Sequence, residues 1–264
     1  MMSATRAWVE ALADILAYGE NVSPRGSSTR EILHRTMTMD MRRPVMCLPT
    51  RSLHYRFMAA EAYWILTGDS LLSNIAPWNS RIKDFSDDGT TFFGAYGPMV
   101  MSQLSYVVGK LKSDPATRQA GLTIWRQNPP QTKDYPCTIA MWFQIREGKL
   151  NCHVFMRSSD AWLGVPYDVF NFSMISHMVC ARLNVDSAST DLVEPGRLYL
   201  TAASAHLYQP NWEDARACSQ SSYVDAQPMT PRRLWNDEHS LMETLRELRD
   251  TKPGHNLRWW EVLK

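Results

Sequence analysis

The stretch TIAMWFQIREGKLNCHVFMR, residues 138–157, decides the fold of this chain. Its two halves, 138–146 and 149–157, are rich in β-branched and aromatic residues, which favour strands. Glu147-Gly148 between them suits a tight hairpin turn. The stretch therefore predicts two neighbouring strands, and the middle of the chain is expected to form a sheet.

The segments on either side of this hairpin add short strands and amphipathic helices. Short runs at 122–125 and 197–200 predict further strands, and 69–97 predicts a polar loop region. The tail from Ala217 is polar, contains proline and has no clear assignment. No linker, repeat or low-complexity segment divides the chain, so we expect one domain, residues 1–264, with an α+β fold and a mixed or antiparallel sheet. Apolar residues at helical spacing predict helices over residues 7–18, 53–66, 99–112, 168–183 and 240–249.

The composition is that of an ordinary soluble globular protein. Hydrophobic residues make up 44% and charged residues 21% of the 264 residues, and the net charge is +1. This balance gives no support for a nucleic-acid partner or a polybasic membrane anchor. Apolar stretches fall short of a membrane span and the N-terminus lacks a signal-peptide core, so we expect a cytoplasmic protein. The five cysteines are odd in number and form no CxxC pair, which argues against a disulfide framework or zinc site and favours a single reactive thiol.

Several polar side chains lie where a purely structural role is hard to explain. Glu61 lies inside an apolar helix, where an unpaired carboxylate is costly. Cys137 lies at a loop-to-strand junction, residues 157–160 (RSSD) close a strand, and Asp168 opens a helix. Each alone has an ordinary explanation, such as a helix cap for the aspartate. Their joint occurrence indicates a functional site.

At these and other positions the sequence resembles the thymidylate synthase superfamily, from about Arg25 to Tyr208. The resemblance implies the α+β fold of that superfamily, with a large mixed β-sheet flanked by helices and a homodimer packed sheet to sheet. It also implies a nucleoside 5′-monophosphate substrate, 5,10-methylenetetrahydrofolate as one-carbon donor, and no metal. The matching motifs are residues 61–68 (EAYWILTG), 74–75 with Trp78, 94–97 (GAYG), 114–115 with Arg118, 136–137 (PC), 157–160 (RSSD), 163–167 (LGVPY) and 206–208 (HLY).

The covalent chemistry that the resemblance implies suits these residue types. C5 of a pyrimidine becomes nucleophilic only after C6 is attacked, and a thiolate suits that attack because sulfur both adds and leaves readily. Cys137 is the implied nucleophile, and nearby arginines are expected to lower the pKa of its thiol. Glu61 is expected to manage protons and ordered water near the base.

The resemblance also implies the residues that bind the ligands. Guanidinium groups match phosphate oxygens bidentately, and Arg118 is expected to reach the phosphate from the partner subunit. Gln119 stands where the family usually has a second arginine, so Arg126 or another arginine would have to compensate. The implied ligands are Arg25, Arg157 and Ser158 for the phosphate, His206 and Tyr208 for the sugar 3′-hydroxyl, Tyr96 in the nucleotide site, and Trp78, Asp160 and Gly164 for the folate.

The residue after the LGVPY motif indicates the base. Uracil-methylating enzymes of the family carry Asn there, whose amide donates to O4 and accepts from N3–H, whereas this chain carries Asp168. An ionised carboxylate only accepts hydrogen bonds, so it opposes uracil O4 but suits the 4-amino group and a protonated N3 of cytosine. Uracil is therefore expected to be disfavoured by at least about tenfold. The deoxycytidylate hydroxymethylases of the superfamily carry the same aspartate.

Two further departures bear on the fate of the added carbon. Thr138 follows the nucleophile where thymidylate synthases usually have His. The C-terminal residues 259–264 (WWEVLK) do not match the apolar segment that seals thymidylate synthases during hydride transfer. Sealing favours a methyl product, whereas access of water favours a hydroxymethyl product. The sequence therefore favours a deoxycytidylate (dCMP) 5-hydroxymethylase.

Other interpretations stay open at this point. Within enzymes they are a dCMP 5-methyltransferase that releases dihydrofolate, a CMP 5-hydroxymethylase, and a dUMP-using thymidylate synthase. From another class comes a non-catalytic nucleotide-binding member of the fold, since fold alone does not fix function. The sequence also leaves open whether the product enters modified phage DNA or a nucleoside natural product.

Overall fold

The computed structural model describes residues 2–185, 192–221 and 229–251 of the chain. The strands are β1 (Glu20–Val22), β2 (Thr29–Asp40), β3 (Gly121–Thr123), β4 (Thr138–Arg146), β5 (Lys149–Met156), β6 (Ser159–Asp160) and β7 (Glu194–Tyr208). They form one sheet in the order β1-β2-β7-β5-β4-β3, and β6 also pairs with β7. β7 is antiparallel to β2 and parallel to β5 and β6. The large mixed sheet of an α+β fold is thus confirmed.

The predicted hairpin lies near one end of this sheet and is also confirmed. β4 and β5 pair antiparallel from Arg146 and Lys149 at the turn to Thr138 and Met156 at the far end. The turn residues 147–148 have φ angles of 52° and 68°. Both values lie in the left-handed region that tight hairpin turns require. Alternate residues of β5 are buried, so the hairpin has one covered and one open face.

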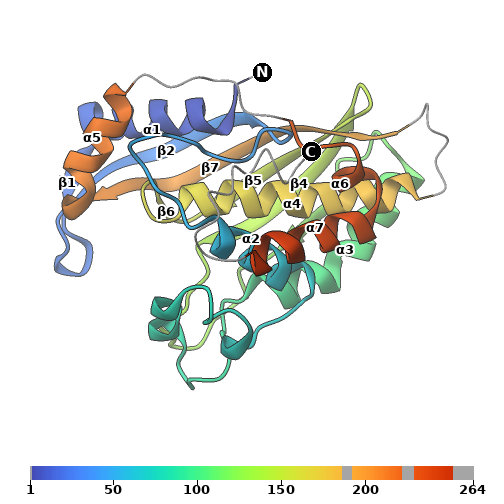
Figure 1. Ribbon diagram of the computed structural model, residues 1–264, viewed down its shortest axis with the longest axis horizontal. Coiled ribbons are helices and arrows are strands. Elements are labelled where there is room, and N and C mark those ends of the chain that lie inside the picture. The colour runs from blue at the N-terminus through green and yellow to red at the C-terminus, as the bar shows by residue number, and fades with distance from the viewer. Residues whose placement is uncertain (1, 186–191, 222–228, 252–264) are drawn as a thin grey trace.

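Helices cover one face of the sheet (Figure 1). α1 (Ala4–Tyr18) packs on β2, and α4 (Val165–Asn184) packs on β7 and β5. The apolar residues of α4 run all round the helix, and nearly all of them are buried because further helices cover it. The remaining helices are α2 (Tyr55–Leu66), α3 (Tyr96–Ser113), α5 (Trp212–Gln220), α6 (Arg233–Asn236) and α7 (Glu238–Asp250), with short 3-10 turns at Pro24–Gly26, Leu72–Asn74, Ser80–Phe85 and Gln209–Asn211.

The other face of the sheet carries partly exposed aromatic side chains. Trp142, His153 and Tyr199 are register partners in a row across β4, β5 and β7. The rings of His153 and Tyr199 stack with centroids 4.6 Å apart. Trp142 is 37% exposed and Phe155 is 44% exposed. A row of exposed aromatic side chains is typical of a surface that packs against another protein surface.

The sequence failed to predict β2 and most of β7. Only residues 197–200 of β7 were predicted, yet the strand runs over 15 residues and pairs with β2 along its length. The alternation of β2 breaks at His34, which has a φ of 53° and is skipped in the register. Ile32 packs against the core before this break and Met37 after it, so no continuous period of two runs through β2.

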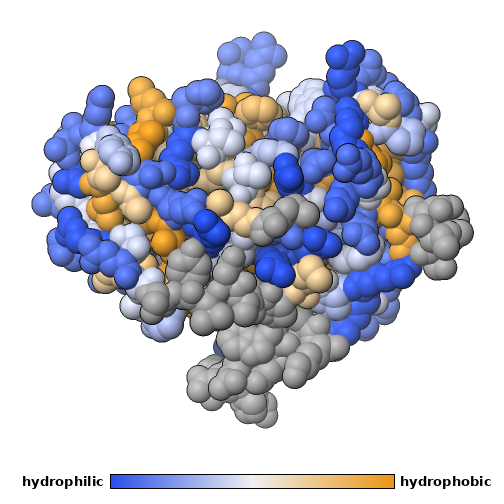
Figure 2. Space-filling model, turned by 90° about the horizontal axis from the view of Figure 1, so that it is seen from above, coloured by the Kyte–Doolittle hydropathy of each residue, from blue (hydrophilic) through white to orange (hydrophobic). Residues whose placement is uncertain are grey.

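The other differences are shifted ends of predicted elements and short elements that were not predicted, namely β1, β6, α5 and α6. α3 begins at Tyr96, inside the predicted loop region, and 3-10 turns interrupt that region. α5 occupies the start of the tail that had no assignment. Among the described residues, no helix is long and apolar enough to cross a membrane. The surface seen from above is mainly hydrophilic, with smaller apolar groups between (Figure 2).

Candidate active site

A cleft of about 170 Å³ opens beside the start of β4. Its lining comes from α2, the start of α3, the first turns of α4 and the loop before β4. Apolar side chains form one part of the lining, namely Trp64, Ile65, Ile82, Phe85 and Phe92. The polar side chains are Glu61, Tyr96, Asp134, Asp168 and Asn171. Polar groups that converge in an apolar cleft are typical of a small-molecule site.

Cys137 adjoins this cleft as the residue before β4. Its carbonyl oxygen accepts a hydrogen bond from the Arg157 backbone N–H at 2.9 Å. The next residue, Thr138, donates its N–H and its hydroxyl to the Tyr96 hydroxyl oxygen at 3.2 and 2.9 Å. Tyr96 accepts both bonds, so its own O–H remains to donate toward the cleft. These contacts fix the backbone that carries the thiol.

The Cys137 thiol is half-buried, and its surroundings favour the protonated form. Burial raises the pKa of this thiol, and the guanidinium of Arg157 opposes that rise. The nearby carboxylates raise the pKa further, in the order Asp168, Asp160 and Asp134. The expected effect of an arginine is present, since Arg157 lowers the pKa of Cys137, but burial and carboxylates outweigh this single cation and the net shift is upward.

The Arg157 side chain is held against the backbone that precedes Cys137. Its Nε donates to the carbonyl oxygen of Pro136 and its Nη2 to that of Tyr135, both at 3.0 Å. Its charged carbon lies 5.8 Å from the centre of the Trp125 ring. The residue as a whole is exposed. Arg157 is thus held as a cation beside the Cys137 thiol, and the exposed part of its side chain remains open to an anion.

Glu61 and Asn171 form a pair in the cleft. Oε2 of Glu61 accepts from Nδ2 of Asn171 at 2.7 Å. Burial raises the pKa of Glu61 to about 7, against the opposing effect of the Asn171 hydrogen bond. Oδ1 of Asn171 is buried and has no hydrogen-bond partner among the described residues. A carboxyl that titrates near neutrality can both give and take a proton, which is the property expected of Glu61.

Asp168 lies in the first turn of α4, against Gly164. Its backbone N–H donates to the Gly164 carbonyl at 3.0 Å, and a Cβ at Gly164 would lie 3.3 Å from Oδ2 of Asp168. Burial, followed by the charges of Glu61 and Asp160, raises the pKa of Asp168 well above its usual range. The sequence predicted an ionised carboxylate, whereas these surroundings favour the neutral form, which both donates and accepts hydrogen bonds.

β6 brings the predicted folate residue Asp160 beside the predicted sugar residue His206. The two are register partners on β6 and β7. Oδ1 of Asp160 accepts from the backbone N–H groups of Trp162 and Leu163 at 2.8 and 2.9 Å. His206 is buried, its ring lies edge-on to Tyr208 at 5.1 Å, and its Nδ1 has no partner within the described residues. A buried ring nitrogen without a partner is a group that a ligand hydroxyl can satisfy.

The remaining predicted phosphate residues lie near the same end of β7. The N–H of Gln209, just after β7, donates to the Ser28 carbonyl at 2.9 Å, which ties the turn of Arg25 to the end of the strand. Arg25 is exposed and has a φ of 53°. Ser158 connects β5 to β6 and directly follows Arg157. The topology therefore gathers these residues around the paired ends of β6 and β7.

Trp78 lines a second hollow of about 240 Å³ that shares Trp64 with the cleft. Its Nε1 donates to the Arg249 carbonyl at 3.1 Å. The Arg249 guanidinium lies over the rings of Tyr63 and Trp78, at 4.6 and 5.1 Å. The end of α7 thus contacts the aromatic side chains expected at the folate. Aromatic walls of this kind suit the flat rings of a folate, and so does a carboxylate such as Asp160.

Arg118 lies at the open face of the sheet rather than in the lining of the cleft. Its carbonyl oxygen accepts from Nε1 of Trp142 at 2.9 Å, and the residue is exposed. Gln119 is tied to its own subunit, because its side-chain oxygen accepts from Nζ of Lys110 at 3.0 Å. Within one chain, Arg118 is therefore not brought to Cys137.

Arg126, the other arginine considered for the phosphate, lies elsewhere. Its guanidinium is 4.5 Å from the centre of the Phe93 ring. It lines a hollow together with Asp87 and Asp88. Two carboxylates beside the guanidinium disfavour an anionic ligand at that position. The structure gives no support for Arg126 as the replacement for a second phosphate arginine.

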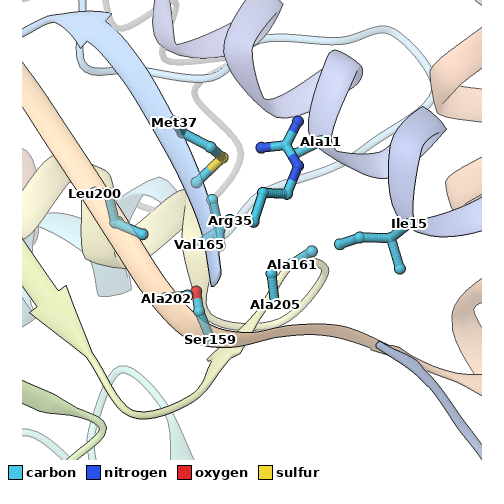
Figure 3. A pocket seen from close by; sticks show the side chains of 10 residues that line it. All are labelled: Ala11, Ile15, Arg35, Met37, Ser159, Ala161, Val165, Leu200, Ala202 and Ala205. Atoms are coloured by element: carbon cyan, nitrogen blue, oxygen red, sulfur yellow. The ribbon is translucent and has the colours of Figure 1, made fainter. Parts of the chain in front are cut away.

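A smaller cavity lies between α1, β2 and β7, beside Ser159 (Figure 3). Its volume is about 10 Å³ and its lining is largely apolar. The buried hydroxyl of Ser159 has no hydrogen-bond partner in the described parts of the chain. Small-molecule sites need a far larger volume, so this cavity is a gap in the packing behind the site.

The structure adds site residues that the sequence did not indicate. Asp134 lines the cleft three residues before Cys137, and Asn171 lies about one helical turn after Asp168. The position of Asn171 follows from helical spacing and could have been inferred, whereas Asp134 lies in a loop where spacing does not fix a side chain. Arg249 could not, because nothing in the sequence links it to a tryptophan 171 residues away.

The cleft is surrounded by carboxyls with raised pKa values and has a thiol with a guanidinium beside it. This arrangement is typical of enzymes that form a covalent intermediate. The chain belongs to the thymidylate synthase family, whose profile matches residues 6–228. It is thus a one-carbon transferase that acts on a pyrimidine nucleotide, with methylenetetrahydrofolate as the co-substrate of the family. The chain is also similar to a deoxyuridylate hydroxymethyltransferase of Bacillus phage SP01. The two are 29% identical over 274 residues, which cover 94% of this chain and 67% of that protein.

Proposed function

We propose that this enzyme hydroxymethylates C5 of deoxycytidylate through a covalent bond between Sγ of Cys137 and C6 of the base. One observation carries the proposal: Glu61 and Asp168, from separate helices, line a single cleft, and the charge of Asp168 acts on the Cys137 thiol. The one-carbon unit comes from 5,10-methylenetetrahydrofolate. The whole chain serves as one catalytic domain.

The residues of the cleft divide the reaction between them. The thiolate of Cys137 adds to C6, and the charge that this attack creates is taken up at N3, where Asp168 delivers a proton. C5 then bonds to the one-carbon unit, Glu61 takes up the proton that C5 loses, and tetrahydrofolate leaves as its bond to that carbon breaks. The base now carries an exocyclic methylene. Water adds to that carbon and loses a proton, the C5=C6 double bond re-forms, Cys137 leaves as thiolate, and N3 returns its proton to Asp168.

Asp168 favours cytosine in both of its protonation states, and not only when it is ionised. A neutral carboxyl donates to N3 of cytosine and accepts from the 4-amino group, while the ionised form accepts from both once N3 is protonated. Both protonation states are thus complementary to cytosine. Uracil pairs only with the neutral form, which donates to O4 and accepts from N3–H. The carboxyl that loses its proton during the attack therefore fits cytosine better.

Deoxyuridylate is the second candidate substrate. The raised pKa of Asp168 keeps the neutral form available, and that form is the one that suits uracil. The similar protein of Bacillus phage SP01 is named for activity on deoxyuridylate. That name also supports a hydroxymethyl product over a methyl one. The C-terminal residues 259–264, which bear on the same choice, lie outside the described residues.

The ligand-binding roles follow the ends of the strands. Arg25, Arg157 and Ser158 bind the phosphate, and His206 and Tyr208 bind the sugar hydroxyl. The unpartnered Nδ1 of His206 supports this assignment. Tyr96 donates toward the nucleotide from its place between Thr138 and the cleft. On the folate side the proposed residues are Asp160, Gly164 and Trp78.

A homodimer completes the phosphate site in this proposal. The aromatic row on the open face supports a sheet-to-sheet interface. Trp142 of that row holds the backbone of Arg118, so the arginine stands at the surface that the partner would cover. Arg118 then reaches the phosphate bound by the partner subunit, where it adds a cation that each chain lacks at Gln119.

Product analysis tests this function directly. The enzyme is incubated with methylenetetrahydrofolate and, in parallel, with dCMP, dUMP or CMP, and the products are separated and weighed by mass spectrometry. We expect fastest conversion of dCMP, to a product that carries CH₂OH. Formation of a methyl product with release of dihydrofolate would contradict hydroxymethylation. Faster conversion of dUMP or CMP than of dCMP would instead identify that nucleotide as the substrate.

The covalent step has its own control. Cys137→Ser should abolish the release of tritium from [5-³H]dCMP, because the oxygen nucleophile is far weaker at neutral pH. The buried Cys152→Ser serves as the matched control, since that thiol lies on the covered face of β5. Full tritium release by the Cys137 variant would show that no covalent bond forms there. Absence of release by the unaltered enzyme with every nucleotide would favour a non-catalytic binding protein.

A further inference from the structure

The carboxyl of Asp134 lines the cleft but has no role in the reaction proposed above. It lines the cleft together with Glu61 and Asp168, and it precedes Cys137 by three residues. Its charge acts on the Cys137 thiol, which means that the two groups lie near each other. The base attached to Cys137 through C6 carries its new carbon on the adjacent atom, C5. A group near this thiol and within the cleft is therefore also near that carbon.

One oxygen of Asp134 is anchored and the other is open. Oδ2 accepts from the Gly94 N–H at 2.7 Å, and the backbone N–H of Asp134 donates to Oγ1 of Thr132 at 3.0 Å. A Cβ at Gly94 would overlap the Asp134 carbonyl oxygen, so only glycine allows this approach. Within the described residues Oδ1 of Asp134 accepts no hydrogen bond, which leaves one strong acceptor for a molecule in the cleft.

Apolar side chains line the same cleft as Asp134. They include Ile82, Phe85 and Phe92, which offer no hydrogen bond to a water molecule. Burial raises the pKa of Asp134, against the opposing effect of the Gly94 N–H. A carboxylate in surroundings of this kind holds a single water molecule firmly, since few other partners compete for it.

The other two carboxyls already have partners or tasks. Oε2 of Glu61 is bound to Asn171 at 2.7 Å, and Glu61 is the group proposed to take the proton from C5. Asp168 lies against Gly164 and faces the edge of the base in the proposed reaction. With Glu61 occupied by the proton of C5, no group has yet been assigned the proton of the water that adds to the exocyclic methylene.

We propose that Asp134 binds this water and accepts its proton as the general base, an inference that rests on the proposed hydroxymethylation. The water oxygen forms a bond to the methylene carbon and gives its proton to Oδ1 of Asp134. The electron pair of the exocyclic double bond moves to re-form C5=C6 and expels Sγ of Cys137 as thiolate. The proton then passes from Asp134 to the thiolate or to solvent, so no oxidant or reductant is needed.

A competition between water and an added thiol tests this role. 2-Mercaptoethanol can also add to the exocyclic methylene, and it gives a thioether in place of the hydroxymethyl group. The ratio of hydroxymethyl to thioether product is measured by mass spectrometry at fixed thiol concentration, so it reports on water addition whatever the overall rate. Asp134→Asn keeps an oxygen for the Gly94 N–H but loses the carboxylate charge. We expect this variant to lower the ratio by about tenfold or more.

Asp87→Asn is the matched control. Asp87 accepts from the Lys133 N–H at 2.9 Å and from the Thr132 hydroxyl, so it holds the same loop without lining the cleft. Its variant should keep the ratio of the unaltered enzyme. An unchanged ratio in Asp134→Asn would overturn the proposal, and so would an equal fall in both variants, which would mean that loop position alone matters. A methyl product from the unaltered enzyme would instead overturn the proposed function itself.

Discussion

The two sides of the cleft hold their protons in different ways. On the side of α2 and α4, burial raises the pKa of both Glu61 and Asp168, and the charges of Glu61 and Asp160 raise the pKa of Asp168 further. On the side of β4, burial also raises the pKa of Cys137, but the guanidinium of Arg157 opposes it. On the carboxyl side, formed by α2 and α4, the surroundings therefore favour the protonated carboxyls. On the thiol side, at β4, the cation of Arg157 favours the thiolate.

This difference couples the two sides. A neutral carboxyl repels a thiolate far less than an ionised one, so a proton on Asp168 makes the ionisation of Cys137 less costly. When Asp168 gives its proton to the base, it becomes a carboxylate that repels a thiolate. By then the thiolate has already bonded to C6. The groups titrate as a set, and each of the following changes alters one side while leaving the other in place.

The largest expected effect comes from the carboxyl side. Asp168→Asn removes the proton that is delivered to N3 of cytosine, so turnover of dCMP should fall by about a hundredfold or more. Turnover of dUMP should survive, because an amide donates to O4 and accepts from N3–H. Steady-state rates with both nucleotides measure the change in preference. Asp160→Asn is the control, since it should change both rates alike; an equal loss of both rates in Asp168→Asn would mean that Asp168 does not read the base.

A smaller effect is expected on the thiol side. Arg157→Gln removes the cation that lowers the pKa of Cys137, and a rise of one pKa unit reduces the thiolate present at neutral pH about tenfold. The rate of iodoacetamide modification of Cys137, followed by peptide mass spectrometry across pH, measures that pKa. Arg157→Lys keeps the charge and should stay near the unaltered enzyme. Identical pH profiles for the Gln and Lys variants would show that Arg157 acts only through its backbone contacts.

The sequence predicted the features that rest on short spacings. The Glu147-Gly148 turn, the place of Cys137 directly before a strand, and the helix that begins near Asp168 all depend on a few neighbouring residues. The family motifs added the broader expectation of a mixed sheet. The family is confirmed, whereas the roles of single site residues remain proposals.

The features that the sequence missed depend on contacts between distant segments. β2 pairs with β7 across more than half the chain, and the irregularity at His34 hides its alternation. The pKa of Cys137 was expected to fall because the site was predicted to hold arginines near the thiol. It rises because burial and carboxylates from other elements act on the same atom, and neither is visible in a local motif.

The smallest expected effect concerns stability on the carboxyl side. The pKa of Glu61 rises from about 4.5 to about 7 on folding, so the folded protein binds more protons than the unfolded chain between these pH values. Stability contributed by the neutral carboxyl is therefore fully present below about pH 4.5 and is lost as pH rises through about 7. Glu61→Gln removes this titration and should unfold a few degrees higher than the unaltered protein at pH 8, with no such gain at pH 4. The exposed Glu20→Gln is the control, because it should shift neither value in thermal unfolding followed by circular dichroism. The raised pKa of Asp168 still makes stability depend on pH in the Glu61→Gln variant. A shallower dependence of the unfolding temperature on pH than in the unaltered protein therefore supports burial as the reason that Glu61 is protonated.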